Sequence, residues 1–279
     1  MNFGQYDYRF GIETILERRS SRFYNITIAQ SGSLRMIRFD MLGFEGVIHL
    51  KNSSIVLFDY MHLQLLCLLW NSTPERILII GLGAGILPKI FHYLSPRTLI
   101  HIVEIDLEVI NLARKYFDFK ENNMIRIFAE DGRHFIERQP SNQYDVIIID
   151  AFTANGRIPH ALRTIECLKE YLRILKSTGL VVANFLYEQE SRYRETYSRA
   201  RFKHIYRGIT PGNYILIGLN REANIFNQTE LQVRAKILQQ NKSLSNMNWI
   251  EEVKYIHNGN DNKWNISAAI FTDKVHEES

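Results

Sequence analysis

A short apolar run that ends in three closely spaced glycines constrains this chain more than any other feature. Residues 77–85 read ILIIGLGAG, and a short apolar run bounded by glycine is typical of a buried parallel strand. Gly81, Gly83 and Gly85 carry no Cβ, so they allow a tight turn and a close approach to a ligand. Their G-x-G-x-G spacing places the third glycine one position early for the dinucleotide fingerprint. An alternative is a tight strand-to-helix turn that binds no ligand.

A second strand with an acid at its end follows the glycines. Leu99–Val103 is the next apolar run, and Glu104 lies 23 residues after Gly81. An acid in this position usually holds a ribose diol. The motif therefore predicts an adenosine-type ligand across the carboxyl ends of a parallel sheet. The alternative for Glu104 is a solvated strand end.

Strands and helices alternate through the middle of the chain. This order predicts an α/β fold with a doubly wound parallel sheet. Two apolar runs joined by a short turn follow, and they predict an antiparallel pair of strands. Parallel strands followed by an antiparallel pair are the order seen in nucleoside-sulfonium transferases. The expected strands are 77–80, 99–103, 124–128, 144–149 and 179–185, then 202–206 and 214–219; the expected helices are 107–117, 133–138, 162–175 and 231–240, and a last strand is expected at 267–271.

The first sixty residues have a different pattern. Ile12, Ile15 and Leu16 lie at helical spacing, which predicts a helix before Ser21. From Ser21 to about residue 57, short β-prone runs alternate with turn residues, which predicts a small antiparallel domain. We expect a helix over 61–70 and two domains, 1–59 and 60–279.

Composition places few limits on function. The 279 residues carry a formal net charge of +4, which is too mild to indicate a nucleic-acid partner. We find no signal peptide and no apolar stretch long enough for a bilayer, so we expect a cytoplasmic protein with no membrane partner. Cys67 and Cys167 are expected to be reduced and buried. The histidines show no metal-ligand spacing, so no metal is predicted.

One basic segment offers a nucleic-acid interpretation. Residues 191–207 contain six basic side chains and one acid, Glu195, interleaved with Tyr193, Tyr197 and Phe202. A solvated helix face is the alternative, and we favour it, so no nucleic-acid partner is expected.

Five sequence blocks, in order, resemble the spermidine synthase (polyamine aminopropyltransferase) family, including its N-terminal β-hairpin domain. The resemblance runs from about residue 34 to residue 219. It implies a Rossmann-like sheet of the class I methyltransferase type, with S-adenosylmethionine or its decarboxylated form as co-substrate. The blocks are FDYMH at 58–62, ILIIGLGAG at 77–85, VEID at 103–106, EDG at 130–132 and YDVIIID at 144–150.

The resemblance assigns the nucleoside half of the site. It implies that Gly81, Gly83 and Gly85 bind the donor and that Glu104 binds the ribose hydroxyls, because a carboxylate accepts two hydrogen bonds from a diol. Asp131, before Gly132, matches the residue that binds the adenine amino group. Asp106 is either a ligand or the N-cap of the following helix.

The resemblance also implies a general base. Asp150 ends a buried strand, where the family keeps the carboxylate that deprotonates the attacking amine. The alternative is an aspartate that only orders the following loop. Tyr60 has the spacing of a pocket tyrosine in the family, with packing against the sheet as its alternative.

Three departures fall in the amine half of the site. Ala84 replaces an aspartate of the glycine loop that faces a cationic amino group. Thr153 stands where the family has a second aspartate that grips the amine. Met61 and His62 replace a histidine and a glutamate. The loss of carboxylates weakens the case for a di- or triamine and leaves room for the carboxylate of intact S-adenosylmethionine.

The resemblance therefore implies a transferase that moves an aminopropyl group from decarboxylated S-adenosylmethionine to a small amine in polyamine biosynthesis. The departures leave two alternatives: an S-adenosylmethionine-dependent methyltransferase, or a non-catalytic nucleoside-binding homologue. An exposed β-hairpin domain would suit a homodimer.

Overall fold

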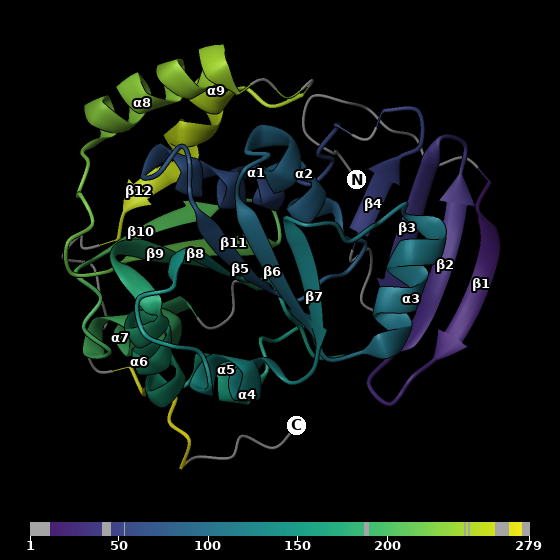
Figure 1. Ribbon diagram of the computed structural model, residues 1–279, viewed down its shortest axis with the longest axis horizontal. Helices are drawn as coiled ribbons and strands as arrows, with labels where there is room; N and C mark the ends of the chain where they lie inside the picture. The colour runs from purple at the N-terminus through teal and green to yellow at the C-terminus, as the bar shows by residue number, and fades with distance from the viewer. Residues whose placement is uncertain are drawn as a thin grey trace.

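The chain folds into a small N-terminal sheet and a larger α/β unit packed beside it (Figure 1). The computed structural model describes residues 12–40, 46–52, 54–186, 190–242, 244, 246–259 and 268–274. Several side-chain contacts join the two parts. Glu17 accepts hydrogen bonds from Lys115 and Tyr116 at 2.6 Å each, and Arg35 donates to the backbone carbonyl of Tyr116 at 2.9 Å.

The N-terminal sheet has four antiparallel strands in chain order. The predicted hairpins are confirmed, because each strand pairs with the next. The division into domains at 59/60 stays a prediction, although the first helix begins at Asp59. The strands are β1 (Thr14–Ser20), β2 (Asn25–Ser31), β3 (Leu34–Phe39) and β4 (Gly46–His49).

The helix predicted before Ser21 is wrong over the described residues. Residues 14–20 form β1, the edge strand, whose register against β2 shifts between Ile15 and Glu17. Ile15 and Leu16 are both exposed, so they are not the buried face of a helix. The backbone of residues 14–20 forms its hydrogen bonds with β2. The spacing of apolar residues in the sequence does not show such pairing. Residues 1–11 lie outside the described part.

The larger sheet has eight strands in the order β12-β10-β11-β9-β8-β5-β6-β7. The five parallel strands are those expected, and the antiparallel pair follows them as predicted. The parallel strands are β5 (Arg76–Ile80), β6 (Leu99–Glu104), β7 (Ile125–Ala129), β8 (Tyr144–Ile149) and β9 (Leu175–Leu186). The antiparallel pair is β10 (His204–Ile209) and β11 (Asn213–Leu219), and β12 (Ile256–Asn258) completes the sheet.

Helices cover both faces of this sheet (Figure 1). Ile77 and Ile79 belong to one core cluster and Leu78 and Ile80 to another, so β5 is buried on both sides. Burial on both sides explains why its sequence is apolar without alternation. One face is covered by α1 (Asp59–Leu65), α2 (Ile86–Leu94), α3 (Leu107–Tyr116), α8 (Gln228–Asn241) and α9 (Trp249–Glu252), and the other by α4 (Gly132–Glu137), α5 (His160–Arg163), α6 (Ile165–Ile174) and α7 (Glu190–Arg199).

Three local details differ from the expectations. The helix predicted over 61–70 continues from α1 as a 3-10 helix, η1 (Leu66–Leu69), and a second one, η3 (Val253–Tyr255), precedes β12. The helix predicted over 162–175 is divided at Thr164, whose side chain caps α6. The strand predicted at 267–271 is wrong for residues 268–271, which are not a strand. Phe271 is instead fully buried between the side chains of Arg163 and Arg192.

Both cysteines, Cys67 and Cys167, are free and buried, as expected. In the described part of the chain, no helix combines the length and apolar character needed to cross a membrane.

Gly81 lies where three parallel strands meet. Its φ is +100°, and its N–H donates to the carbonyl of Val103 in β6 at 2.9 Å. A Cβ at this position would lie 2.3 Å from the backbone oxygen of Asp150. Only glycine fits here, because both the conformation and the approach exclude a side chain.

We expect Gly81→Ala to lower the free energy of unfolding by about 3 kcal/mol or more. A positive φ costs a non-glycine residue about 1–3 kcal/mol, and overpacking adds about 1–3 kcal/mol. Gly212→Ala is the matched control, because Gly212 has a φ of +97° and nothing within 4 Å of its would-be Cβ. Urea denaturation of both variants measures the difference. Equal losses would show that the contact with Asp150 is unimportant.

Candidate active site

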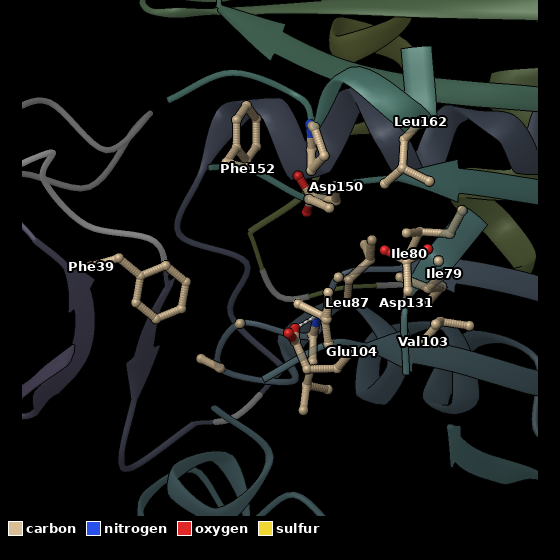
Figure 2. Close-up of a pocket in the computed structure, with 18 of the residues that line it drawn as sticks. Phe39, Ile79, Ile80, Leu87, Val103, Glu104, Asp131, Asp150, Phe152 and Leu162 are labelled. Atoms are coloured by element: carbon tan, nitrogen blue, oxygen red, sulfur yellow. Dashed lines mark hydrogen bonds between the residues drawn. The ribbon is translucent and has the colours of Figure 1, made fainter. Parts of the chain in front are cut away.

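A cavity opens at the carboxyl ends of β5, β6 and β8, where the strand order reverses (Figure 2). Ligands of open α/β sheets bind at such a switch point. Its described lining contains four carboxylates and no lysine, arginine or histidine. The carboxylates are Glu104, Glu130, Asp131 and Asp150.

The glycine loop forms the floor of this cavity. Gly81, Gly83 and Ala84 line it, whereas Gly85 does not. Gly85 precedes α2 with a φ of +68°, and a Cβ there would lie 2.5 Å from the Phe119 ring. The backbone conformation and the contact with Phe119 therefore explain the glycine at position 85 without a ligand. The donor-binding role of Gly85 stays a prediction.

Glu104 is the last residue of β6 and is almost completely buried. Its two carboxylate oxygens accept hydrogen bonds from the backbone N–H groups of Leu82 and Asp106, each at 2.9 Å. Burial raises the pKa of the Glu104 carboxyl to about 7, although these two N–H groups act to lower it. The carboxylate is therefore held in place, and its charge changes near neutral pH.

Asp106 caps α3 and does not line the cavity. Its side chain accepts a hydrogen bond from the backbone N–H of Glu108 at 2.9 Å and another from the hydroxyl of Ser21. Of the two alternatives for Asp106, the structure supports the helix cap.

Glu130, Asp131 and Gly132 bring a third strand end to the cavity, after β7. Asp131 caps α4 by accepting from the backbone N–H of His134 at 3.1 Å. Glu130 forms an ion pair with Arg138, which lowers the pKa of its carboxyl. A Cβ on Gly132 would lie 3.0 Å from Ile80, so this turn packs closely on β5. The assignment of Asp131 to adenine stays a prediction.

Asp150 follows β8 and lies on the opposite side of the cavity from Glu104 (Figure 2). Its Oδ1 accepts a hydrogen bond from the Asn184 amide of β9 at 2.8 Å. Burial raises the pKa of the Asp150 carboxyl, and donation from Asn184 partly opposes this effect. A carboxylate whose pKa is raised in this way is a stronger base than an exposed aspartate, which suits it to accepting a proton.

Aromatic side chains surround the Asp150 side of the cavity. Tyr60 lines it and stacks on Phe58 with ring centroids 5.5 Å apart, and its substrate role stays a prediction. Tyr24 and Phe39 also line it from the N-terminal sheet, and their rings stack at 4.6 Å. Local sequence patterns do not reveal either residue, because only the docking of the two sheets brings them to the cavity.

The loop after Asp150 closes this side. Phe152 lines the cavity, and its carbonyl accepts a hydrogen bond from the Tyr24 hydroxyl at 2.6 Å. Thr153 does not line the cavity; its hydroxyl donates to Asn155 and to the carbonyl of Arg157 within the loop. The substrate role predicted for Thr153 stays a prediction that the geometry does not favour.

The remaining candidates lie elsewhere. Tyr193, Tyr197 and Phe202 are buried in the core, so they cannot stack on bases. The described residues contain no group of histidine, cysteine, aspartate or glutamate arranged to hold a metal ion.

This sheet and cavity define a Rossmann-like fold of the class I methyltransferase type. A probable spermidine synthase from Corynebacterium glutamicum has a similar fold, with a TM-score of 0.69 and 22% identity over 87% of this chain and 93% of that one. The model of the spermine/spermidine synthase domain matches residues 38–207. The chain belongs to the spermine/spermidine synthase family.

Two curated relatives illustrate the similarity in sequence. A polyamine aminopropyltransferase from Vibrio vulnificus is 34% identical over 246 residues, which cover 83% of this chain and 80% of the relative. An eEF1A lysine and N-terminal methyltransferase from Bos taurus is 30% identical over 123 residues, but these cover only 41% of this chain and 18% of the relative.

We expect nucleoside binding to weaken as the pH falls through 7. If the ribose diol binds the Glu104 carboxylate, protonation at a pKa of about 7 removes an acceptor. Methylthioadenosine, which carries no sulfonium charge, should then bind about tenfold more weakly at pH 6 than at pH 8.5. Calorimetric titration measures the dissociation constant. Asp150→Asn should keep this pH dependence and Glu104→Gln should lose it; a constant affinity in the wild type would contradict the assignment.

Proposed function

We propose that the protein transfers an aminopropyl group from decarboxylated S-adenosylmethionine to a small amine, as part of polyamine biosynthesis. The observation that most supports this proposal is the charge of the cavity, which has four carboxylates and no basic side chain in its described lining. Such a lining favours a cationic donor and a cationic acceptor. Membership of the family and the similarity to the Vibrio vulnificus polyamine aminopropyltransferase support the same activity.

The proposed site has a donor side and an acceptor side. On the donor side, Glu104 would bind the ribose, and the turn at Asp131 and Gly132 would hold the adenine. Asp150 faces the space between these groups and the aromatic side chains. The donor would therefore lie across the glycine loop, with its sulfonium near Asp150.

The chemistry needs alignment and one base. The amine nitrogen attacks the propyl carbon bound to sulfur, the carbon–sulfur bond breaks, and its electron pair stays on the sulfur of methylthioadenosine. Asp150 takes the proton that the amine loses. Holding the two reactants in line provides much of the acceleration, and general base catalysis typically adds a factor of about 10² to 10⁴.

The same lining bears on the form of the donor. Intact S-adenosylmethionine carries a carboxylate, which would enter a cavity that already holds four acidic side chains. The decarboxylated form has only cationic groups there. Although Ala84 removes one acid of the family pattern, the acids that remain favour the decarboxylated donor.

Methyl transfer from intact S-adenosylmethionine is the second candidate. The match to the Bos taurus methyltransferase favours it, because residues of this chain align with part of a methyltransferase at 30% identity. Ala84 and Thr153 also fit it. A cytoplasmic location and a homodimer stay predictions from the family resemblance.

We expect calorimetric titration to show tighter binding of decarboxylated than of intact S-adenosylmethionine, because the intact form brings a carboxylate among acids. A preference for the intact form would support the methyltransferase. Binding of neither form would support a non-catalytic protein.

We expect Asp150→Asn to lower kcat for aminopropyl transfer by about 10² to 10⁴, with little change in the affinity for methylthioadenosine. Product formation is followed by chromatography. Asp145→Asn is the matched control: Asp145 lies near the start of the same strand, away from the cavity, where it accepts hydrogen bonds from the backbone of Glu75 and Arg76. It should lose stability and keep kcat. Full activity of Asp150→Asn would remove Asp150 from its proposed role.

A further inference from the structure

A row of amide side chains runs behind Asp150. Asn184 of β9 is almost completely buried and donates from Nδ2 to Asp150 Oδ1 at 2.8 Å. Its Oδ1 in turn accepts from Nδ2 of Asn213, the first residue of β11, at 2.9 Å. Asn213 is half-buried at the end of the sheet. The row therefore connects the cavity carboxylate to the rim of the molecule.

The direction of these bonds follows from their chemistry. A carboxylate can only accept, so the Asn184 amide must present its N–H to Asp150 and its oxygen to Asn213. The Asn213 amide then donates and prevents Asn184 from turning over. Oδ1 of Asp150 thus accepts from a fixed donor, which leaves Oδ2 as the more basic oxygen for an arriving proton.

We propose that Asn184 is a positioning residue for Asp150: it holds Oδ1 as a permanent acceptor and leaves Oδ2 to take the proton of the acceptor amine, while Asn213 fixes the orientation of the Asn184 amide. This inference rests on the proposed role of Asp150 as the base. Neither amide lines the cavity, so both act through Asp150.

A third amide lies beside the same carboxylate. Gln64 of α1 is completely buried, and it acts with Asn184 to lower the pKa of Asp150 against the effect of burial. Its amide makes no hydrogen bond of ordinary geometry to any described residue. Asn184, whose amide nitrogen and oxygen both have partners, is therefore the amide with a fixed orientation toward the carboxylate.

The surroundings of Asp150 contain no competing cation among the described lining residues. The titratable groups that share its cavity are Glu104, Glu130, Asp131, Tyr24 and Tyr60. Acids can only raise the pKa of Asp150. Donation from Asn184 is the larger of the two interactions that lower the pKa of Asp150 against the effect of burial, ahead of Gln64.

The test is the pH dependence of Asn184→Leu, which removes the donor and keeps a similar volume. We expect the acidic limb of kcat/KM to move up by about one pH unit, which is about a tenfold loss at pH values below the limb that is recovered at alkaline pH. Carbon-13 NMR of the Asp150 carboxyl, without substrate, should show the same shift in its titration. Asn213→Ala should shift both in the same direction by less, and it serves as the test if Asn184→Leu does not fold.

Asn220→Leu is the matched control. Asn220 is also a buried asparagine, whose amide donates to the carbonyl of Lys176 at 3.0 Å, away from the cavity. This variant should lose stability without a shift of the acidic limb. A pH-independent loss in Asn184→Leu, with an unchanged Asp150 titration, would overturn the inference. Absence of aminopropyl transfer in the wild type would instead reject the proposed function, and the NMR titration would still decide whether Asn184 controls the protonation of Asp150.

Discussion

The site depends on the contact between two backbones at the centre of the sheet. β5 lies between β6 and β8, and Gly81 turns away at the point where its neighbour, Asp150, leaves β8. The N–H of Asp150 donates to the carbonyl of Ile80 at 2.9 Å. The floor that would hold the donor and the base that would act on the acceptor are therefore adjacent by strand pairing. No flexible loop separates them, so their relative position is as rigid as the sheet.

The cavity gathers buried acids at the expense of stability. Burial raises the pKa of both Glu104 and Asp150, which means that each carboxylate is less stable here than in water. Backbone N–H groups compensate at Glu104, and the Asn184 amide compensates at Asp150. A cationic ligand would supply the missing counter-charge. The free protein is thus prepared for such a ligand, and binding should lower both pKa values.

Local sequence patterns were sufficient for most of the fold and for bringing Gly81, Gly83, Glu104, Asp131 and Gly132 to one cavity. The apolar runs, the three glycines and the acids at strand ends each follow from rules that act within a few residues. Tyr24 and Phe39 were missed because they reach the cavity only when the N-terminal sheet docks on the α/β unit. The same limit applies to β1, whose strand form depends on its partner β2. No pattern in the sequence marks Asn184 either, because its proposed role depends on contact with Asp150, 34 residues away in the chain.

The two halves of the cavity come from different parts of the chain, and this has a consequence for specificity. The donor half is built from strand ends and the glycine loop. The other half adds Tyr24 and Phe39 from the N-terminal sheet, and the hydrogen bond from Tyr24 to the Phe152 carbonyl joins that sheet to the loop after Asp150. Ala84 is a further contact, because a Cβ on Gly46 of β4 would lie 2.7 Å from the Cβ of Ala84. The glycine loop and β4 therefore pack closely only because position 46 is glycine. A substitution at Tyr24 or Phe39 should therefore alter the Asp150 side of the cavity and leave the glycine loop unchanged.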